Sequence, residues 1–169
     1  MKYRTIVADP PWPIARPGNP KHPPYAVMQI EELKLLQPQR DVAAESGHLY
    51  LWTTQNFVCE ARAIAEAWGF FPITLVTWVK NRFGTGHRFR SATEFFWFCE
   101  RGPEKFNFPR KNIPSWFNWP QGGHSVKPAA FYDLVEEISP GPYLEMFARH
   151  QRFGWDTWGN EALEHVSIA

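Results

Sequence analysis

Short apolar runs alternate with longer amphipathic stretches along this chain, and the alternation predicts its secondary structure. Apolar residues at helical spacing predict helices over residues 28–37, 56–70 and 128–139, with Gly69 closing the second. Five apolar runs have the length and composition of buried strands: "RTIVAD" (4–9), "HLYLWTT" (48–54), "FPITLVTWVK" (71–80), "ATEFFWFCE" (92–100) and "GPYLEMFAR" (141–149). Strands that alternate with helices predict an α/β fold with a largely parallel sheet.

Two long segments fit neither period. Residues 13–27 hold five prolines and follow the first predicted strand, and residues 101–127 mix proline, glycine, asparagine and aromatic residues. Long irregular segments in a compact domain are commonly functional. Ligands of parallel α/β sheets bind beyond the carboxyl ends of the strands, so the segment after the first strand is a candidate for binding.

Length and composition narrow the class of protein. At 169 residues we expect a single domain over 1–169. Aromatic residues reach 17%, which fits either an aromatic core or a protein that stacks on bases. The two cysteines have no ligand spacing, so neither a metal site nor a disulfide framework is predicted. No apolar run has the ~18 residues of a membrane span, and the first residues do not fit a signal peptide, so we expect a cytoplasmic protein.

Charge is distributed unevenly although the net charge is only +1. Residues 80–111 form a basic segment in which eight lysines and arginines face three glutamates. The basic residues are Lys80, Arg82, Arg88, Arg90, Arg101, Lys105, Arg110 and Lys111. A solvated surface loop and a nucleic-acid contact both explain such a segment.

The first strand ends in "DPPW", residues 9–12, and this tetrad suits one kind of chemistry. The amino group of adenine is a poor nucleophile because its lone pair is delocalised into the ring. Two acceptors for its N–H groups help it attack a methyl donor: the Asp9 carboxylate and the Pro10 carbonyl, which proline holds in one direction. The ring of Trp12 could stack on the base. The alternative is a strand-ending turn, which Asp-Pro pairs usually form.

The tetrad begins an ordered series of blocks: "DPPW", "PPYAVM", "LYLWTT", "AWGF", "WVK", "GTGHRF", "HSVKP", "ISPGPYLEMFAR" and "GWDTWGNE". This series resembles the S-adenosylmethionine-dependent adenine N6-methyltransferases typified by the catalytic subunit of the eukaryotic mRNA methyltransferase, with bacterial and phage members. The resemblance implies a Rossmann-like domain with the catalytic strand first and the cofactor-binding strand late. It also implies S-adenosylmethionine as the cofactor.

The resemblance assigns roles to residues across the chain. The catalytic tetrad is Asp9, Pro10, Pro11 and Trp12, and the target-base pocket includes Tyr25 and Glu94. Asp9 also belongs to the cofactor site, together with Lys127, Glu145, Phe147, Arg149, Asn160 and Glu161. Glu145 and Arg149, four residues apart on a predicted strand, would share one face and reach the ribose. The alternatives are a surface turn for Tyr25, a solvated Lys127, and a strand-end ion pair for Glu145 and Arg149.

The resemblance also gives the basic segment a role. The loop "KNRFGTGHRFR" (80–90) would contact phosphates through Lys80, Arg82, His87, Arg88 and Arg90. An adenine inside a duplex would have to be turned out of its stack. Three departures limit the resemblance: only eight residues precede Asp9, no GxGxxG loop is found, and no target-recognition domain or zinc finger is found. Specificity and affinity would then be modest, or a partner subunit or the second copy of a homodimer would supply them.

Three hypotheses for the function remain. The first is a bacterial or phage adenine methyltransferase acting on DNA, which we favour because the chain is a bare catalytic domain. The second keeps the chemistry and changes the substrate to RNA, and no residue of this chain separates the two. The third is a non-catalytic nucleic-acid-binding subunit of the same fold, which the intact tetrad disfavours.

Overall fold

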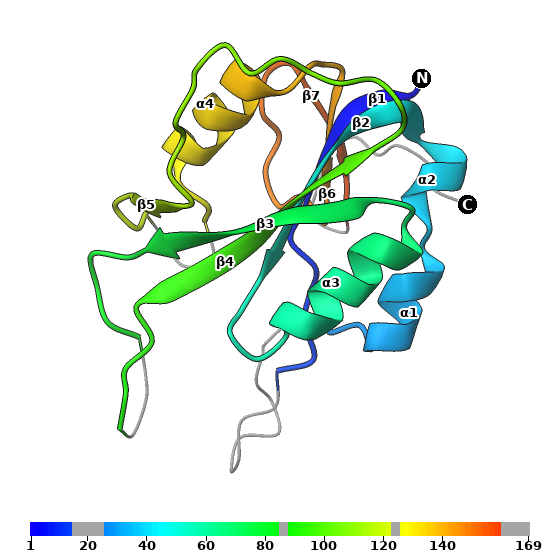
Figure 1. Cartoon of the computed structure of the whole chain (residues 1–169). Coiled ribbons are helices and arrows are strands. Elements are labelled where there is room, and N and C mark those ends of the chain that lie inside the picture. The colour runs from blue at the N-terminus through cyan, green and yellow to red at the C-terminus, as the bar shows by residue number, and fades with distance from the viewer. Residues whose placement is uncertain (15–25, 85–87, 123–125, 160–169) are drawn as a thin grey trace.

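The computed structural model describes residues 1–14, 26–84, 88–122 and 126–159. Within these ranges, seven strands form one sheet in the order β5-β3-β4-β2-β1-β6-β7 (Figure 1). The strands are β1 (Tyr3–Ala8), β2 (Ala43–Thr53), β3 (Phe71–Val79), β4 (Thr93–Arg101), β5 (Trp116–Asn118), β6 (Tyr143–Met146) and β7 (Trp155–Trp158). The helices are α1 (Ile30–Leu35), α2 (Pro38–Asp41), α3 (Val58–Ala67) and α4 (Ala129–Ile138).

Strand direction confirms the predicted fold class. β1 runs parallel to β2 and β6, β6 to β7, and β3 to β5. Among these seven strands β4 is the reversed one, and it is antiparallel to both β2 and β3. The chain therefore has an α/β fold of Rossmann-like type with a mostly parallel sheet, in which the carboxyl ends of β1, β2 and β6 meet at one edge.

Successive residues of the central strands bury opposite faces. On β1, Ile6 packs with the cluster under α1 and α3, whereas Val7 packs with the cluster under α4. On β2, Leu51 packs with the cluster under α1 and α3, and Trp52 packs with the cluster under α4. Helices cover both faces of the sheet (Figure 1). The apolar runs are continuous because both faces of these strands are buried.

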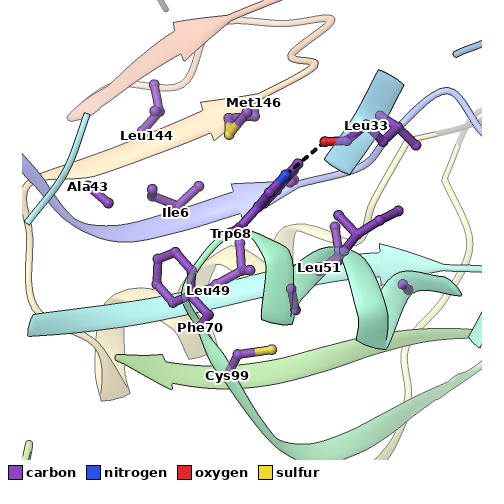
Figure 2. Packing of buried hydrophobic residues seen from close by; sticks show 14 of the residues in the cluster. Ile6, Leu33, Ala43, Leu49, Leu51, Trp68, Phe70, Cys99, Leu144 and Met146 are labelled. Atoms are coloured by element: carbon purple, nitrogen blue, oxygen red, sulfur yellow. Dashed lines mark hydrogen bonds between the residues drawn. The ribbon is translucent and has the colours of Figure 1, made fainter. Parts of the chain in front are cut away.

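The end of α3 follows from its sequence. Gly69 has a φ of 73°, its N–H donates to the Glu66 carbonyl, and the Phe70 N–H donates to the Ala65 carbonyl. This pair of bonds is a Schellman motif, and the glycine closes the helix as predicted. Trp68 is fully buried, and its Nε1 donates to the Leu33 carbonyl over 2.8 Å, which joins α3 to α1 (Figure 2).

Several elements differ from their predictions, and β2 begins at Ala43, five residues before the predicted strand at 48–54. The helix predicted over 28–37 is shorter, because Gln37 adopts a left-handed φ of 41° before Pro38, and a separate α2 follows. The strand predicted over 141–149 ends at Met146, because Phe147 has a φ of 62°. Strands β5 and β7 were not predicted, since "WFN" and "WDTW" are too short to show a period.

We expect Trp68→Phe to lower the free energy of unfolding by about 1–3 kcal/mol, because the buried Leu33 carbonyl loses the shorter of its two hydrogen bonds and the smaller ring leaves a void. Urea denaturation followed by circular dichroism measures this change. The matched control is Trp116→Phe, on a side chain that is 59% exposed, which should change stability by less than about 0.5 kcal/mol. Equal effects of the two substitutions would contradict the role of the Trp68 bond.

Candidate active site

The candidate site lies where β1 ends. Val7 pairs with Glu145 of β6, so their side chains share the face that α4 covers. Asp9 is two residues beyond Val7 and would return to the same face if the extended chain continued. The backbone thus brings the acid of the tetrad and the acid of β6 to one side of the sheet edge.

An ammonium holds the Asp9 carboxylate in place. Lys127 Nζ lies 2.8 Å from Asp9 Oδ2 and 3.0 Å from Glu94 Oε2, and its side chain is only 10% exposed. Glu94 Oε1 in turn accepts a hydrogen bond from Lys80. The centre of the Trp52 ring lies 4.7 Å from Lys127 Nζ, close enough for a cation–π contact. The ion pairs therefore join four side chains of alternating charge into one cluster, in the order Asp9, Lys127, Glu94 and Lys80.

Mutual pairing dominates the electrostatics of this cluster. Burial alone would lower the pKa of Lys127, but Asp9 and Glu94 outweigh it and raise that pKa above its ordinary value. Burial alone would raise the pKa of Glu94, but Lys127 and Lys80 hold it below its ordinary value. Both groups are therefore charged at neutral pH.

A cavity of about 310 Å³ opens beside this cluster. This volume lies at the lower end of the range found for ligand pockets. Five residues that the resemblance assigned to a cofactor line it: Asp9, Lys127, Glu145, Phe147 and Arg149. Arg149 also lines the cavity, but it lies beyond the end of β6. The prediction that Glu145 and Arg149 share one face of a single strand was therefore wrong, although both residues line the cavity.

Tyr132 of α4 fixes the Glu145 side chain. Its hydroxyl donates to Glu145 Oε1 over 2.6 Å. Burial raises the pKa of Glu145 and Asp9 adds to that effect, whereas the Tyr132 bond, Lys127 and Arg152 oppose it. The Arg152 guanidinium lies 5.2 Å from the centre of the Tyr132 ring and donates to Glu136 and Asp133 of α4. The segment after β6 is thereby fastened to α4 along one wall of the cavity.

The backbone after Asp9 turns tightly. The Trp12 N–H donates to the Pro10 carbonyl over 2.8 Å, and the Met28 N–H donates to the Pro11 carbonyl over 3.0 Å. The Pro10 oxygen is thus oriented by a local bond and retains a second lone pair as an acceptor. The Pro11 oxygen instead anchors the chain that returns toward α1.

Trp12 does not occupy the position expected of a base-stacking ring. Its side chain is 3% exposed, its Nε1 donates to the Trp52 carbonyl over 3.2 Å, and Phe57 stacks on it with centroids 5.2 Å apart. The indole belongs to the core under α3, on the opposite face from Glu145. In this structure it fixes the turn after Asp9, and stacking on a base would require another ring.

The predicted phosphate-contacting residues fall into two groups. Arg82, Arg88 and Arg90 are exposed, as expected of such residues. Lys80 instead is 15% exposed and donates to Glu94, so we exclude it from that group. Four of the predicted site residues lie outside the described ranges: Tyr25, His87, Asn160 and Glu161.

Comparison with known proteins identifies the family. A model of the MT-A70 family matches residues 3–161. The chain belongs to the MT-A70 family. The relatives that it resembles include the type II methyltransferase M.MunI of Mycoplasma sp, at 28% identity over 95% of this chain and 78% of that protein.

Other relatives of this MT-A70 chain are eukaryotic and much longer. The human N(6)-adenosine-methyltransferase catalytic subunit METTL3 is 28% identical over 95% of this chain. A Medicago truncatula protein named as a putative N(6)-adenosine-methyltransferase MT-A70-like is 30% identical over the same share. The chain spans only 28% and 26% of the length of these two proteins.

Two kinds of feature are absent from the described ranges of this MT-A70 chain. No helix in those ranges is both long and apolar enough to cross a membrane. The same ranges contain no group of three or more His, Cys, Asp or Glu side chains that could hold a metal ion.

Sequence reasoning missed two residues of the site. Tyr132 and Arg152 both line the cavity, and neither was singled out from the sequence. The only signal for Tyr132 was a hydroxyl-bearing side chain on the predicted helix that begins directly after Lys127. Arg152 gave no signal, because its partners on α4 lie 16 and 19 residues away along the chain.

We expect Glu94→Gln to lower the free energy of unfolding by about 2 kcal/mol at pH 7, because Lys127 and Lys80 lose a charged partner. The pKa of Glu94 is lower in the folded protein than its ordinary 4.5, so the unfolded chain binds a proton first as the pH falls. Wild-type stability from this group is therefore present above pH 4.5 and lost below it.

The variant lacks this pH-dependent contribution, so urea midpoints between about pH 6 and pH 3 should fall less steeply than in the wild type. Glu31→Gln is the matched control, because that side chain is 80% exposed and its ion pair with Lys34 lies at the surface. An identical acid dependence in the Glu94→Gln variant and the wild type would refute the role of Glu94.

Proposed function

We propose that this MT-A70 chain transfers a methyl group from S-adenosylmethionine to the 6-amino group of adenine in nucleic acid. The observation that carries the proposal is that Asp9, the first residue of the tetrad, lines one cavity together with Lys127 and Glu145. The family match supports a methyltransferase, and the relatives named as adenosine methyltransferases support adenine as the target.

The residues around the cavity fit the proposed cofactor. Lys127 offers an ammonium to a carboxylate, Glu145 offers acceptors to ribose hydroxyls, and Phe147 offers an aromatic face to a purine. Arg149 adds a planar donor near them. When bound, the cofactor would supply an electrophilic methyl carbon on a sulfonium sulfur.

The protein's part in the reaction is to position and polarise the amino group. Lys127 occupies Asp9 Oδ2, so we assign one N–H of the substrate to Oδ1 and the other to the Pro10 carbonyl. Acceptors on both N–H groups stabilise the positive charge that develops on nitrogen. The amine proton becomes acidic only after transfer, so no strong base is required.

We place DNA ahead of RNA as the substrate. M.MunI is named a type II methyltransferase, and this chain covers 78% of its length. Other relatives are named for adenosine, which is a ribonucleoside, but this chain covers less than a third of their length. Incubation with labelled methyl donor and matched DNA and RNA oligomers, followed by nucleoside mass spectrometry, tests both substrates at once.

We expect Asp9→Asn to reduce methyl transfer at least ~100-fold, because an amide lacks the charge that stabilises the developing ammonium. The fold should persist, since Lys127 keeps Glu94 as a partner. The assay is the same mass spectrometry, with the thermal shift on adding S-adenosylmethionine as a measure of cofactor binding.

Asp41→Asn, on an exposed residue of α2, is the control for that experiment. Turnover near the wild-type rate in Asp9→Asn would refute the catalytic assignment. A wild-type protein with no thermal shift and no transfer would instead favour the non-catalytic binding subunit.

We expect Arg82→Ala combined with Arg88→Ala to weaken nucleic-acid binding and to reduce the slope of log K against log salt by about two, because each arginine neutralises one phosphate. Fluorescence anisotropy at several salt concentrations measures this slope. Lys105→Ala removes an exposed charge of the same basic segment outside the loop and should leave the slope nearly unchanged. An unaltered slope in the double variant would remove the loop from the interface.

A further inference from the structure

The connection between β3 and β4 projects from the sheet (Figure 1). We call its described residues, 80–84 and 88–92, the finger. Its base continues the antiparallel pairing, because the Lys80 N–H donates to the Ala92 carbonyl over 2.7 Å and the Gly84 N–H donates to the Ser91 carbonyl over 2.6 Å. The two halves of the finger are therefore held together by backbone bonds.

Two phenylalanines lie on the finger, and both are exposed. Phe83 is 71% exposed and Phe89 is 96% exposed. Phe83 is partly covered, because the Arg90 guanidinium lies 6.0 Å from its ring centre and Arg90 Nε donates to the Gly84 carbonyl over 3.0 Å. Phe89 presents almost its whole ring to solvent, so folding does not account for its position.

The charges around these rings indicate the chemistry of a partner. Residues 81–91 carry three arginines and no acidic residue. A single exposed aromatic residue is ordinary on a protein surface, but rings interleaved with guanidinium groups match an anionic partner with flat apolar faces. Nucleic acid offers both, as phosphates for arginine and base faces for phenylalanine.

The finger starts at the proposed reaction centre. Lys80, its first residue, donates to Glu94, and Glu94 accepts from Lys127, which pairs with Asp9. Three contacts therefore lead from the base of the finger to the acid that we assign to the target amino group. A strand whose adenine reached Asp9 would therefore lie near the base of the finger.

We propose that Phe89 stacks on a base adjacent to the target adenine while Arg82 and Arg88 contact the flanking phosphates. This inference rests on the proposed function and names a residue outside the cavity. In a duplex the ring fills the space that the extruded adenine leaves, and in a single strand it covers the face of the neighbouring base. The shared chemistry is an unstacked base face.

The test compares Phe89→Ala and Phe89→Trp with the wild type. Phe89→Ala should bind oligomers about tenfold more weakly, because it cannot stack on a base, whereas Phe89→Trp should retain wild-type affinity. The salt slope should be unchanged in both, in contrast with the arginine variant, since the phosphate contacts remain. The control is Phe71→Ala, 66% exposed at the other end of β3, which should bind as the wild type does.

Two versions of the experiment show whether Phe89 stacks in a duplex or on a single strand. A duplex with 2-aminopurine at the target position should brighten on binding the wild type and brighten less with Phe89→Ala if the ring acts as a wedge. Equal duplex signals, with the tenfold weakening confined to single strands, identify the neighbouring base of a single strand instead. Either pattern supports stacking by Phe89.

Three outcomes overturn the inference. Unchanged affinity in Phe89→Ala removes the ring from the interface, and a salt slope reduced as in the arginine variant means that it acts through charge. If Phe89→Ala keeps its affinity but loses a dimer that the wild type forms in sedimentation, the finger instead makes contact between two copies of the chain. In each case wild-type methyl transfer, measured separately, shows whether the proposed function survives.

Discussion

The buried ammonium of Lys127 is the constraint on which the site depends. A charged group with 10% of its side chain exposed is costly unless it is paired, and its two partners come from segments far apart in the sequence. Asp9 follows the first strand, Glu94 lies on β4, and Lys127 precedes α4. Removing one partner of a buried pair leaves an uncompensated charge, so the pairing fixes these three segments relative to one another. The aromatic face of Trp52 completes the enclosure.

The same pairing organises the proposed chemistry before any substrate arrives. With Oδ2 held by Lys127, the Asp9 carboxylate has one orientation, and the Pro10 carbonyl has one as well because Trp12 N–H is bound to it. Acceptors fixed in advance lose no rotamer freedom when the amino group binds, which is how such sites lower a barrier. Glu145 is held in a similar way by Tyr132, and Tyr132 by the Arg152 contact. Each of these acceptors thus has a second residue that orients it.

Local pattern predicted those parts of this structure that local interactions determine. Apolar runs predicted β1 to β4, of which β1 and most of β2 are buried on both faces, and Gly69 marked the end of α3 by its left-handed φ. The position of Trp12 could not be predicted, since the turn after Pro10 breaks the alternation of a strand and sends the indole to the other core. β7, Tyr132 and Arg152 likewise depend on pairing between distant segments, which a single sequence does not show.

Glu94 connects the two regions to which function is assigned. It follows Thr93, the first residue of β4, and its two carboxylate oxygens accept from Lys80 and Lys127. A carboxylate shared in this way cannot rotate toward one lysine without weakening its bond to the other. The base of the finger and the ammonium beside Asp9 are therefore not positioned independently. A nucleic acid that binds the finger would act on the same carboxylate that orients Lys127, which gives binding a direct physical route to the geometry of the reaction centre.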